Sequence, residues 1–420
     1  MPCSIKALLS ACVLIAACSS KPKDPPPAPA PAPVQPEPPK PPPSPPPMAD
    51  ITPLVTASNT FGWQLWKQLG TTGNAAMSPA SVTTALAMTS GGAKAATLAG
   101  MKKVLAFEGD PSDWGKLASR LRTPGRSLEL RVANRLFGEK SYKLEAPFVE
   151  FTKNVFEAPL EAVDFAGAPD ASRDAINTWV AKQTNDRIKN LLPPPSIDRL
   201  TKLVLVNAIY FLADWDVAFE PTATQPAAFA GAKQPVPTMH AVGSYKLAKA
   251  DHVAVLELPY KNADAAMYVV LPDQVDGLAA VEKSLDASRF EAWRSAATEQ
   301  RVAIALPKFT IDPKDPVELS KPLAALGMAD AFDAKRADFT GIAAPPNPAD
   351  HLFISAVFHK AFVKVDEKGT EAAAATAVVM APKGAAPAPA IEFKADHPFL
   401  FVIVDGKTGL VLFVGRVSQP

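Results

Sequence analysis

The sequence predicts a domain of mixed α-helices and β-strands with large, mainly antiparallel or mixed sheets. Segments with helical spacing of apolar residues dominate the first half of the chain, and β-rich apolar runs dominate the second half. After the first fifty residues, roughly 370 residues of ordinary globular composition remain, enough for one large core. The 43 basic and 42 acidic side chains nearly cancel, which argues against a nucleic-acid partner bound through excess positive charge.

Three segments are predicted to be helical. Residues 51–69 carry apolar side chains at helical spacing, and residues 79–106 form two helices separated by Gly91 and Gly92. Ser78 before Pro79 is a favourable start, because serine caps the first amides and proline suits the first turn. Residues 171–192 are amphipathic and are expected to end at three consecutive prolines.

Strands are predicted for the remainder. Residues 203–212 form a nearly continuous apolar run, typical of a strand that is covered on both faces. Two hairpins are expected, from residues 253–258 with 266–271 and from 399–404 with 410–414. Single strands are expected at residues 302–306 and 352–365.

The first residues predict export. Lys6 precedes an apolar run at residues 7–17 that is too short to cross a membrane, so residues 1–17 are expected to be a signal peptide. The run ends in small residues before Cys18, which resembles a bacterial lipobox and predicts lipidation of Cys18. The alternative is a plain secretory signal in which Cys18 is incidental. We expect an exported protein anchored at a bacterial outer membrane or cell surface, facing the periplasm or the exterior.

Residues 18–49 are predicted to be a tether. Proline supplies 16 of the 27 residues from Lys21 to Pro47, which excludes a helix or a central strand and favours an extended spacer. A ligand for proline-binding domains is the alternative. Cys3 and Cys12 would leave with the signal peptide, so the mature domain is expected to lack a disulfide.

Motifs for catalysis and metal binding are absent from the sequence. It contains no His-Glu-x-x-His, no Gly-x-Ser-x-Gly and no phosphate-binding Gly-rich loop, so we expect no enzyme activity, cofactor or metal. A hydrolase with a triad assembled from distant residues stays as a minor alternative. His359 lies within a predicted strand and is expected to be buried and hydrogen-bonded.

The segment from Glu367 to Met380 combines helix-favouring composition with a position directly after a strand. Its even-numbered positions from Thr370 onward carry no charge and are mostly small, so one face could be buried in a sheet. By composition alone, an exposed low-complexity loop is the alternative.

At this segment the sequence resembles the serpin family, and the resemblance extends over residues 51–420. The matching blocks, in order, are NAAMSPASV at 74–82 with ALAM at 85–88, NAIYF at 207–211, LELPY at 256–260, LPKF at 306–309, LGM at 326–328, EKGTEAAAAT at 367–376, and ADHPF at 395–399 with LFVGRV at 412–417.

The resemblance implies a serpin domain over residues 50–420, with three β-sheets, eight or nine helices and an exposed reactive-centre loop at about residues 367–391. It also implies covalent suicide inhibition of a serine protease by a monomer. The protease cleaves the loop, which then inserts into the main sheet as a new strand. A non-inhibitory serpin that acts as a binding or structural module is the alternative.

Residue roles follow from the same resemblance. It places a polar latch where the sheet must part, formed by Ser78, Ser81, Asn207 and His359, and it places Trp215 where the loop enters. The hinge comprises Glu367, Gly369, Thr370, Glu371, Ala372, Ala373, Ala374, Ala375 and Thr376. Gly369 is expected to supply unusual backbone angles at the bend.

Counting from Gly369 as in the serpin family, the resemblance implies a reactive bond between Lys383 and Gly384, which predicts a trypsin-like target. The stretch after Gly384 is longer than the family usually has. Met380, with a chymotrypsin- or elastase-like target, therefore stays as the alternative.

Overall fold

The seven-stranded sheet of the computed structural model contains the segments that the sequence analysis associates with loop insertion. The structure describes residues 50–70, 73–122, 126–347, 350–370 and 389–420. All of them belong to the unit Ala49–Pro420. The strands of this sheet follow the order β10-β12-β13-β4-β2-β3, with β11 also paired to β12. Their bounds are β2 Leu128–Glu139, β3 Glu161–Val163, β4 Leu203–Asp214, β10 Phe309–Ile311, β11 Val317–Glu318, β12 Ala356–Asp366 and β13 Gly369–Thr370.

A nine-stranded sheet forms the other layer, in the order β1-β16-β15-β8-β7-β6-β9-β14 with β5 paired to β6. Both predicted hairpins are confirmed, as β7–β8 and β15–β16. The bounds are β1 Ala75–Met77, β5 Gln225–Ala227, β6 Val236–Ala250, β7 Val253–Pro259, β8 Ala265–Pro272, β9 Thr298–Pro307, β14 Ile391–Lys394, β15 Phe399–Asp405 and β16 Val411–Val417.

The described residues thus form two hydrogen-bonded sheets, where the resemblance implied three. The long strand β6 explains the difference, because it pairs with β9 from Thr238 to Leu247 and with β7 from Leu247 to Ala250. Strand β6 therefore joins two groups of strands into one continuous hydrogen-bonded sheet. The mixed, mostly antiparallel character of the sheets agrees with the sequence prediction.

Nine α-helices occur in the described ranges, which agrees with the expected number. Their bounds are α1 Thr52–Leu69, α2 Pro79–Ser90, α3 Ala95–Val104, α4 Trp114–Leu121, α5 Ala146–Phe156, α6 Pro169–Gln183, α7 Leu278–Ser284, α8 Ala287–Ala296 and α9 Ser320–Leu323. Short 3-10 turns lie at Pro111–Asp113, Pro221–Ala223, Lys261–Ala263 and Ala329–Phe332, and a π-turn lies at Ala324–Met328. No helix of the described part is long and apolar enough to cross a membrane.

Two predicted boundaries are wrong. The helix expected over residues 171–192 ends at Gln183, because Asn185 and Asp186 adopt left-handed backbone angles that a helix cannot contain. The strand expected from residue 352 begins at Ala356, since pairing with β4 begins there at Val204.

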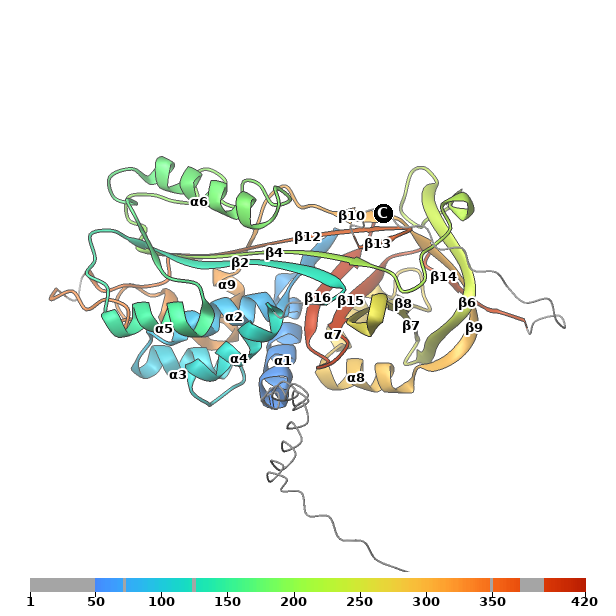
Figure 1. The fold of residues 1–420 in the computed structure, drawn as a ribbon, viewed down its shortest axis with the longest axis horizontal. Helices are drawn as coiled ribbons and strands as arrows, with labels where there is room; N and C mark the ends of the chain where they lie inside the picture. Colours follow the sequence, from blue (N-terminus) through green and yellow to red (C-terminus); the bar gives the residue numbers. More distant parts are fainter. Residues whose placement is uncertain (1–49, 71–72, 123–125, 348–349, 371–388) are drawn as a thin grey trace, which may run out of the picture. The chain divides into compact units, whose positions relative to one another are not determined.

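The seven-stranded sheet has two covered faces. In Figure 1, α6 lies on one face of β12, β4 and β2, and α2 lies on the opposite side. Side chains of β4 alternate between two apolar clusters: Leu205 and Ile209 pack in the larger core, whereas Val206 and Ala208 pack beneath α6. Continuous burial of β4 explains its unbroken apolar sequence.

Candidate functional site

Five polar side chains meet at the centre of the seven-stranded sheet. Strand register aligns His359, Asn207 and Asn134 in one row across β12, β4 and β2. Asn207 donates to Ser81 Oγ at 2.6 Å and hydrogen-bonds His359 Nδ1 and Asn134 Oδ1. At the start of α2, the amide of Ser78 donates to His359 Nε2 at 3.1 Å, and Ser78 Oγ accepts from the amide of Ser81. The structure thus brings together all four residues of the expected polar latch and adds Asn134.

The hydrogen bonds fix the protonation of His359. Its Nε2 accepts from an amide, so the single ring proton lies on Nδ1 and is donated to Asn207 Oδ1. Complete burial lowers the pKa of His359 to about 3, because no counter-charge compensates the loss of solvent. His359 is therefore neutral across the physiological range, and the latch does not depend on its charge.

The latch lies on the seam between β4 and β12. These two strands pair in parallel over seven positions, from Ala356 opposite Val204 to Phe362 opposite Tyr210. The hydrogen bond between His359 and Asn207 crosses this seam, so a strand entering between β4 and β12 must break it.

The first residues of the hinge already occupy one end of the seam. Strand β13, Gly369–Thr370, is antiparallel to both β12 and β4, with Thr370 opposite Val365 on one side and Ala213 on the other. Thr370 is fully buried, and its Oγ1 lies 2.6 Å from the hydroxyl of Tyr260. The seam therefore closes directly beyond a hinge that is partly inserted.

Gly369 is required for a reason that differs from the expected one. Its φ angle is not in the left-handed region that favours glycine. A Cβ atom at this position would instead lie 2.8 Å from the Cα of Asp214 and nearer still to the carbonyl oxygen of Ala213. Both are backbone atoms that cannot move aside, so close approach of β4 excludes any side chain.

Trp215 holds the chain where the hinge enters the sheet. Its ring stacks on Tyr260 with centroids 4.5 Å apart, and its Nε1 donates to the carbonyl oxygen of Asp366 at 3.0 Å. The amide of Trp215 donates to the carbonyl oxygen of Lys368, and the amide of Phe219 donates to the carbonyl oxygen of Glu367. These bonds fix the turn between β12 and β13.

Glu367 is bound from two sides. Lys308 Nζ lies 2.8 Å from one carboxylate oxygen, and Thr224 donates to the other at 2.8 Å. Burial alone would raise the pKa of Glu367, but the hydrogen bonds from Lys308 and Thr224 outweigh it and hold the pKa below its usual range. The carboxylate therefore stays ionised and anchors the start of the hinge.

The family comparison identifies the chain. A family model described as "Serpin (serine protease inhibitor)" matches residues 56–420. The chain belongs to the serpin family. Human Serpin B8 is 40% identical over 379 residues, which cover 87% of this chain and 99% of Serpin B8. The leukocyte elastase inhibitor of Bos taurus is 39% identical over 361 residues, covering 83% of this chain and 93% of that protein.

Solved serpin structures share the fold. Uncleaved ovalbumin superposes with a TM-score of 0.78 at 31% identity, covering 87% of this serpin and all of that chain. Human thyroxine-binding globulin superposes with a TM-score of 0.78 at 27% identity, covering 88% of this serpin and 99% of that chain. The multi-sheet serpin fold expected from the sequence is confirmed.

Several predicted site residues of this serpin lie outside the described residues. These are Glu371, Ala372, Ala373, Ala374, Ala375 and Thr376 of the hinge, Met380, Lys383 and Gly384 around the reactive bond, and Cys18. Their roles stay predictions, as do those of the latch and of Trp215.

The sequence analysis assigned no role to four residues that support the site. Asn134 joins the latch, Tyr260 contacts Thr370, and Lys308 and Thr224 bind Glu367. Tyr260 and Lys308 lie within matched sequence blocks, so a signal existed for their importance. No local signal marked Asn134, because only strand register brings β2 next to β4.

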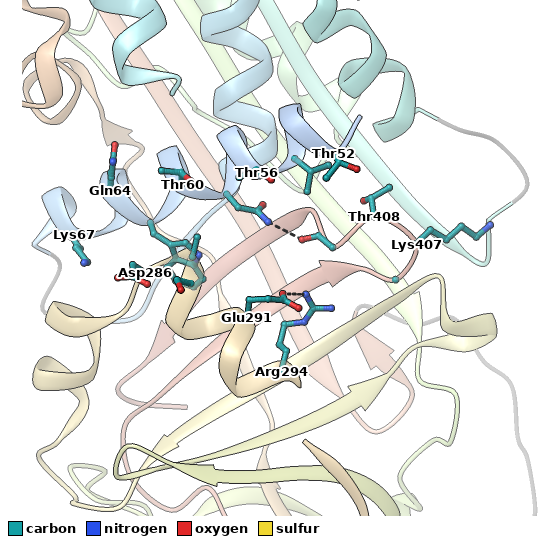
Figure 2. A pocket seen from close by; sticks show the side chains of 17 residues that line it. Thr52, Thr56, Thr60, Gln64, Lys67, Asp286, Glu291, Arg294, Lys407 and Thr408 are labelled. Carbon is teal, nitrogen blue, oxygen red and sulfur yellow. Dashed lines mark hydrogen bonds and ion pairs between the residues drawn. The ribbon is translucent and has the colours of Figure 1, made fainter. Parts of the chain in front are cut away.

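A separate pocket lies between α1 and α8, with a volume of about 820 Å³. Figure 2 shows Thr52, Thr56 and Thr60 on the α1 side, facing Glu291 and its ion-pair partner Arg294 on α8. None of the predicted site residues lines it. No cluster of three potential metal ligands occurs in the described part of the serpin.

Proposed function

We propose that this serpin is a covalent inhibitor of serine proteases that acts by loop cleavage and insertion between β4 and β12. The partly inserted strand β13 is the observation that carries the proposal. Its two residues already pair with both strands in the direction that an inserting loop needs.

Extending this register predicts the inserted state. Because the new strand runs antiparallel to both neighbours, each step along the loop moves one step back along β12 and β4. Thr376 then comes to lie between His359 and Asn207, and Val379 comes between Ala356 and Val204, where the seam ends. The hydroxyl of Thr376 could replace the latch hydrogen bond that insertion breaks.

The same register explains the small residues of the hinge. Positions 373, 375 and 377 would share a face with Phe362, Lys360 and Phe358, which lies beneath α6. All three are alanine, so the strand can enter without displacing the helix through large side chains. Glu371 would lie beside Lys364, which is exposed, so the first charge of the loop could stay solvated.

Energy favours the inserted state. The strand from Glu371 to Val379 can pair on both sides and replaces the single ladder between β4 and β12, a gain of roughly ten hydrogen bonds. At a net 0.5–1.5 kcal/mol each, this stabilises the cleaved form by about 5–15 kcal/mol before packing. The intact protein is then a kinetically trapped state.

Lys383 makes a trypsin-like protease the proposed target, with Gly384 following the cleaved bond. Incubation with trypsin should produce a covalent complex that survives SDS electrophoresis, and Lys383→Ala should reduce its yield at least roughly 10-fold. If Met380 precedes the reactive bond, the complex should form with chymotrypsin or elastase, and Lys383→Ala should leave it unchanged.

Thr370 separates inhibition from simple cleavage. Thr370→Arg would place a charge in the core beside Tyr260, so insertion should stall and the protease should cleave the loop and be released. Thr370→Ser retains the hydroxyl and is the matched control, which should still form the complex. If Thr370→Arg forms as much complex as the wild type, insertion between β4 and β12 is the wrong mechanism.

We also propose that the protein is an exported lipoprotein of bacterial type, with residues 1–17 as the signal peptide and residues 18–49 as a proline-rich tether. Support comes from the small residues before Cys18 and from the proline content that follows. Cys18→Ser should release the mature protein from membranes. A plain secretory signal predicts instead that wild type and variant are equally soluble after export.

A non-inhibitory binding function is the second candidate, and the pocket between α1 and α8 favours it. Its volume of about 820 Å³ suits a small organic molecule. A similar solved structure is a complex of thyroxine-binding globulin with thyroxine. Because Trp63 lines the pocket, thyroxine binding should quench tryptophan fluorescence and raise the melting temperature. No change in either at saturating thyroxine would exclude this ligand.

A further inference from the structure

His397 is buried in the turn that joins β14 to β15, with only 7% of its surface exposed. Its Nδ1 lies 2.7 Å from a carboxylate oxygen of Asp396, and its Nε2 lies 2.7 Å from the carbonyl oxygen of Pro272 at the end of β8. The ring therefore bridges the turn after β14 to a strand near the middle of the nine-stranded sheet.

Both partners of His397 are acceptors. A carbonyl oxygen cannot donate, and an ionised carboxylate cannot donate either, so each ring nitrogen must supply a proton for both hydrogen bonds to exist. The geometry thus requires the imidazolium form. His359 provides the contrast, because its Nε2 faces an amide donor and its ring carries one proton.

Strand β14 leads into this turn. It is an edge strand that pairs with β9 alone, in parallel, over the four positions from Ile391 to Lys394. Beyond these positions, the amide of Ala395 donates to the carbonyl oxygen of Ala305, and the carbonyl oxygen of Asp396 accepts from the amide of Ala230. Phe393 and Ala395 also anchor this segment in the apolar core, and the bond of His397 to Pro272 adds a polar attachment where the strand ends.

The charges around His397 come from three segments. Asp396 contacts the ring directly, and Lys394 on β14 pairs with Glu392 at 2.8 Å. Asp273 follows Pro272, but its carboxylate lies 3.9 Å from Nδ1 of His252. Asp396 is therefore the counter-charge that the imidazolium contacts.

We propose that His397 is a positioning residue for the reactive-centre loop, and that its doubly protonated ring clamps the strand to which the loop returns. The proposal rests on the proposed inhibitory function, because β14 begins directly after the loop. When the ring loses a proton, one of its two hydrogen bonds is lost and β14 loosens. The segment to which the loop returns is then held less tightly, and the intact inhibitor should lose activity faster at alkaline than at mildly acidic pH.

Hydrogen–deuterium exchange of the full-length serpin tests the clamp without a protease. Protection of the segment 391–397, corrected for intrinsic exchange rates, should fall roughly 10- to 100-fold as pH rises from 5.5 to 8.5, the effect expected from one charge-assisted hydrogen bond. His397→Gln should show the low protection at every pH. His252→Gln, which changes a histidine that is exposed, should follow the wild type.

Nitrogen-15 NMR of the histidine rings provides a direct measurement on unaltered protein, should His397→Gln fail to fold. Both nitrogens of His397 should be protonated at pH 6. A ring nitrogen without a proton at that pH, or protection of β14 that does not change with pH, would overturn the proposal. Neither measurement uses a protease, so failure of the clamp is distinguishable from failure of inhibition, which the covalent-complex assay reports.

Discussion

Removal of the Asn207 side chain tests whether the latch holds the intact form. Asn207→Ala deletes the acceptor of His359 Nδ1 and the donor to Ser81 Oγ and Asn134 Oδ1. His359 Nδ1 is left buried without a partner, whereas Ser81 Oγ can still donate to Asn134 Oδ1. The substitution should therefore destabilise the intact serpin without changing any charge.

The magnitude follows from these three losses. The unpartnered His359 Nδ1 costs about 1–3 kcal/mol and each of the two other lost hydrogen bonds about 0.5–1.5 kcal/mol, a total of about 2–6 kcal/mol. With an unfolding entropy of roughly 0.8 kcal/mol/K for a domain of this size, the melting temperature of the intact form should fall by about 3–8 °C.

Asn207→Ala should lower the stability of the cleaved form less than that of the intact form. Insertion separates β4 from β12, so the bond between Asn207 and His359 is already absent there. Thermal unfolding, followed by circular dichroism before and after limited trypsin cleavage, should therefore show that cleavage raises the melting temperature more in Asn207→Ala than in the wild type.

Asn59→Ala is the matched control. The side chain of Asn59 bonds the carbonyl oxygen of Gly409 and the amide of Val411, beside the nine-stranded sheet, so intact and cleaved forms should be destabilised equally. Equal effects of Asn207→Ala on both forms would refute the latch. A wild-type cleaved form that melts no later than the intact form would refute loop insertion altogether.

Three further outcomes are expected. Gly369→Ala should turn the inhibitor into a substrate, because a Cβ atom would collide with the backbone of Ala213; the ratio of cleaved to complexed serpin measures this. Asp405→Asn should lower the free energy of unfolding by about 3–5 kcal/mol in urea titrations, because Arg120 and Arg126, both buried, would lose their shared counter-charge. Burial alone would raise the pKa of Asp405, but the charges of Arg126 and Arg120 outweigh burial and lower this pKa. The stabilisation that ionised Asp405 provides should therefore be complete above pH 4, and it should be lost as the pH falls through the pKa of Asp405 in the folded protein.

Matched variants separate these outcomes from general damage. Gly73→Ala adds a methyl group where no atom lies within 4 Å, so it should inhibit like the wild type. Asp170→Asn changes an exposed carboxylate that pairs with Arg173 and should cost far less stability than Asp405→Asn. If Gly369→Ala inhibits normally, the close approach of β4 does not govern insertion.

Local signals in the sequence were sufficient for several elements. Ser78 was expected to cap α2, and its Oγ accepts from the amide of Ser81 as a cap does. Both hairpins and the buried strand β4 followed from unbroken apolar runs. Strand β2 escaped prediction because charged residues such as Arg131 and Arg135 alternate irregularly with apolar ones, and only pairing with β4 establishes it as a strand.

The sequence by itself determined the family, the two-faced pattern of the hinge and, through the family resemblance, four of the five polar residues at the seam, because these depend on residue type and order along the chain. Tertiary structure decided what the residues touch. It showed that Gly369 is needed for close packing rather than for its backbone angles, and that Thr370 is already buried against Tyr260. It also distinguished His359, which faces an amide donor, from His397, which faces two acceptors. Ser78 lies far from His359 in the chain and Pro272 lies far from His397, so only folding brings these partners together.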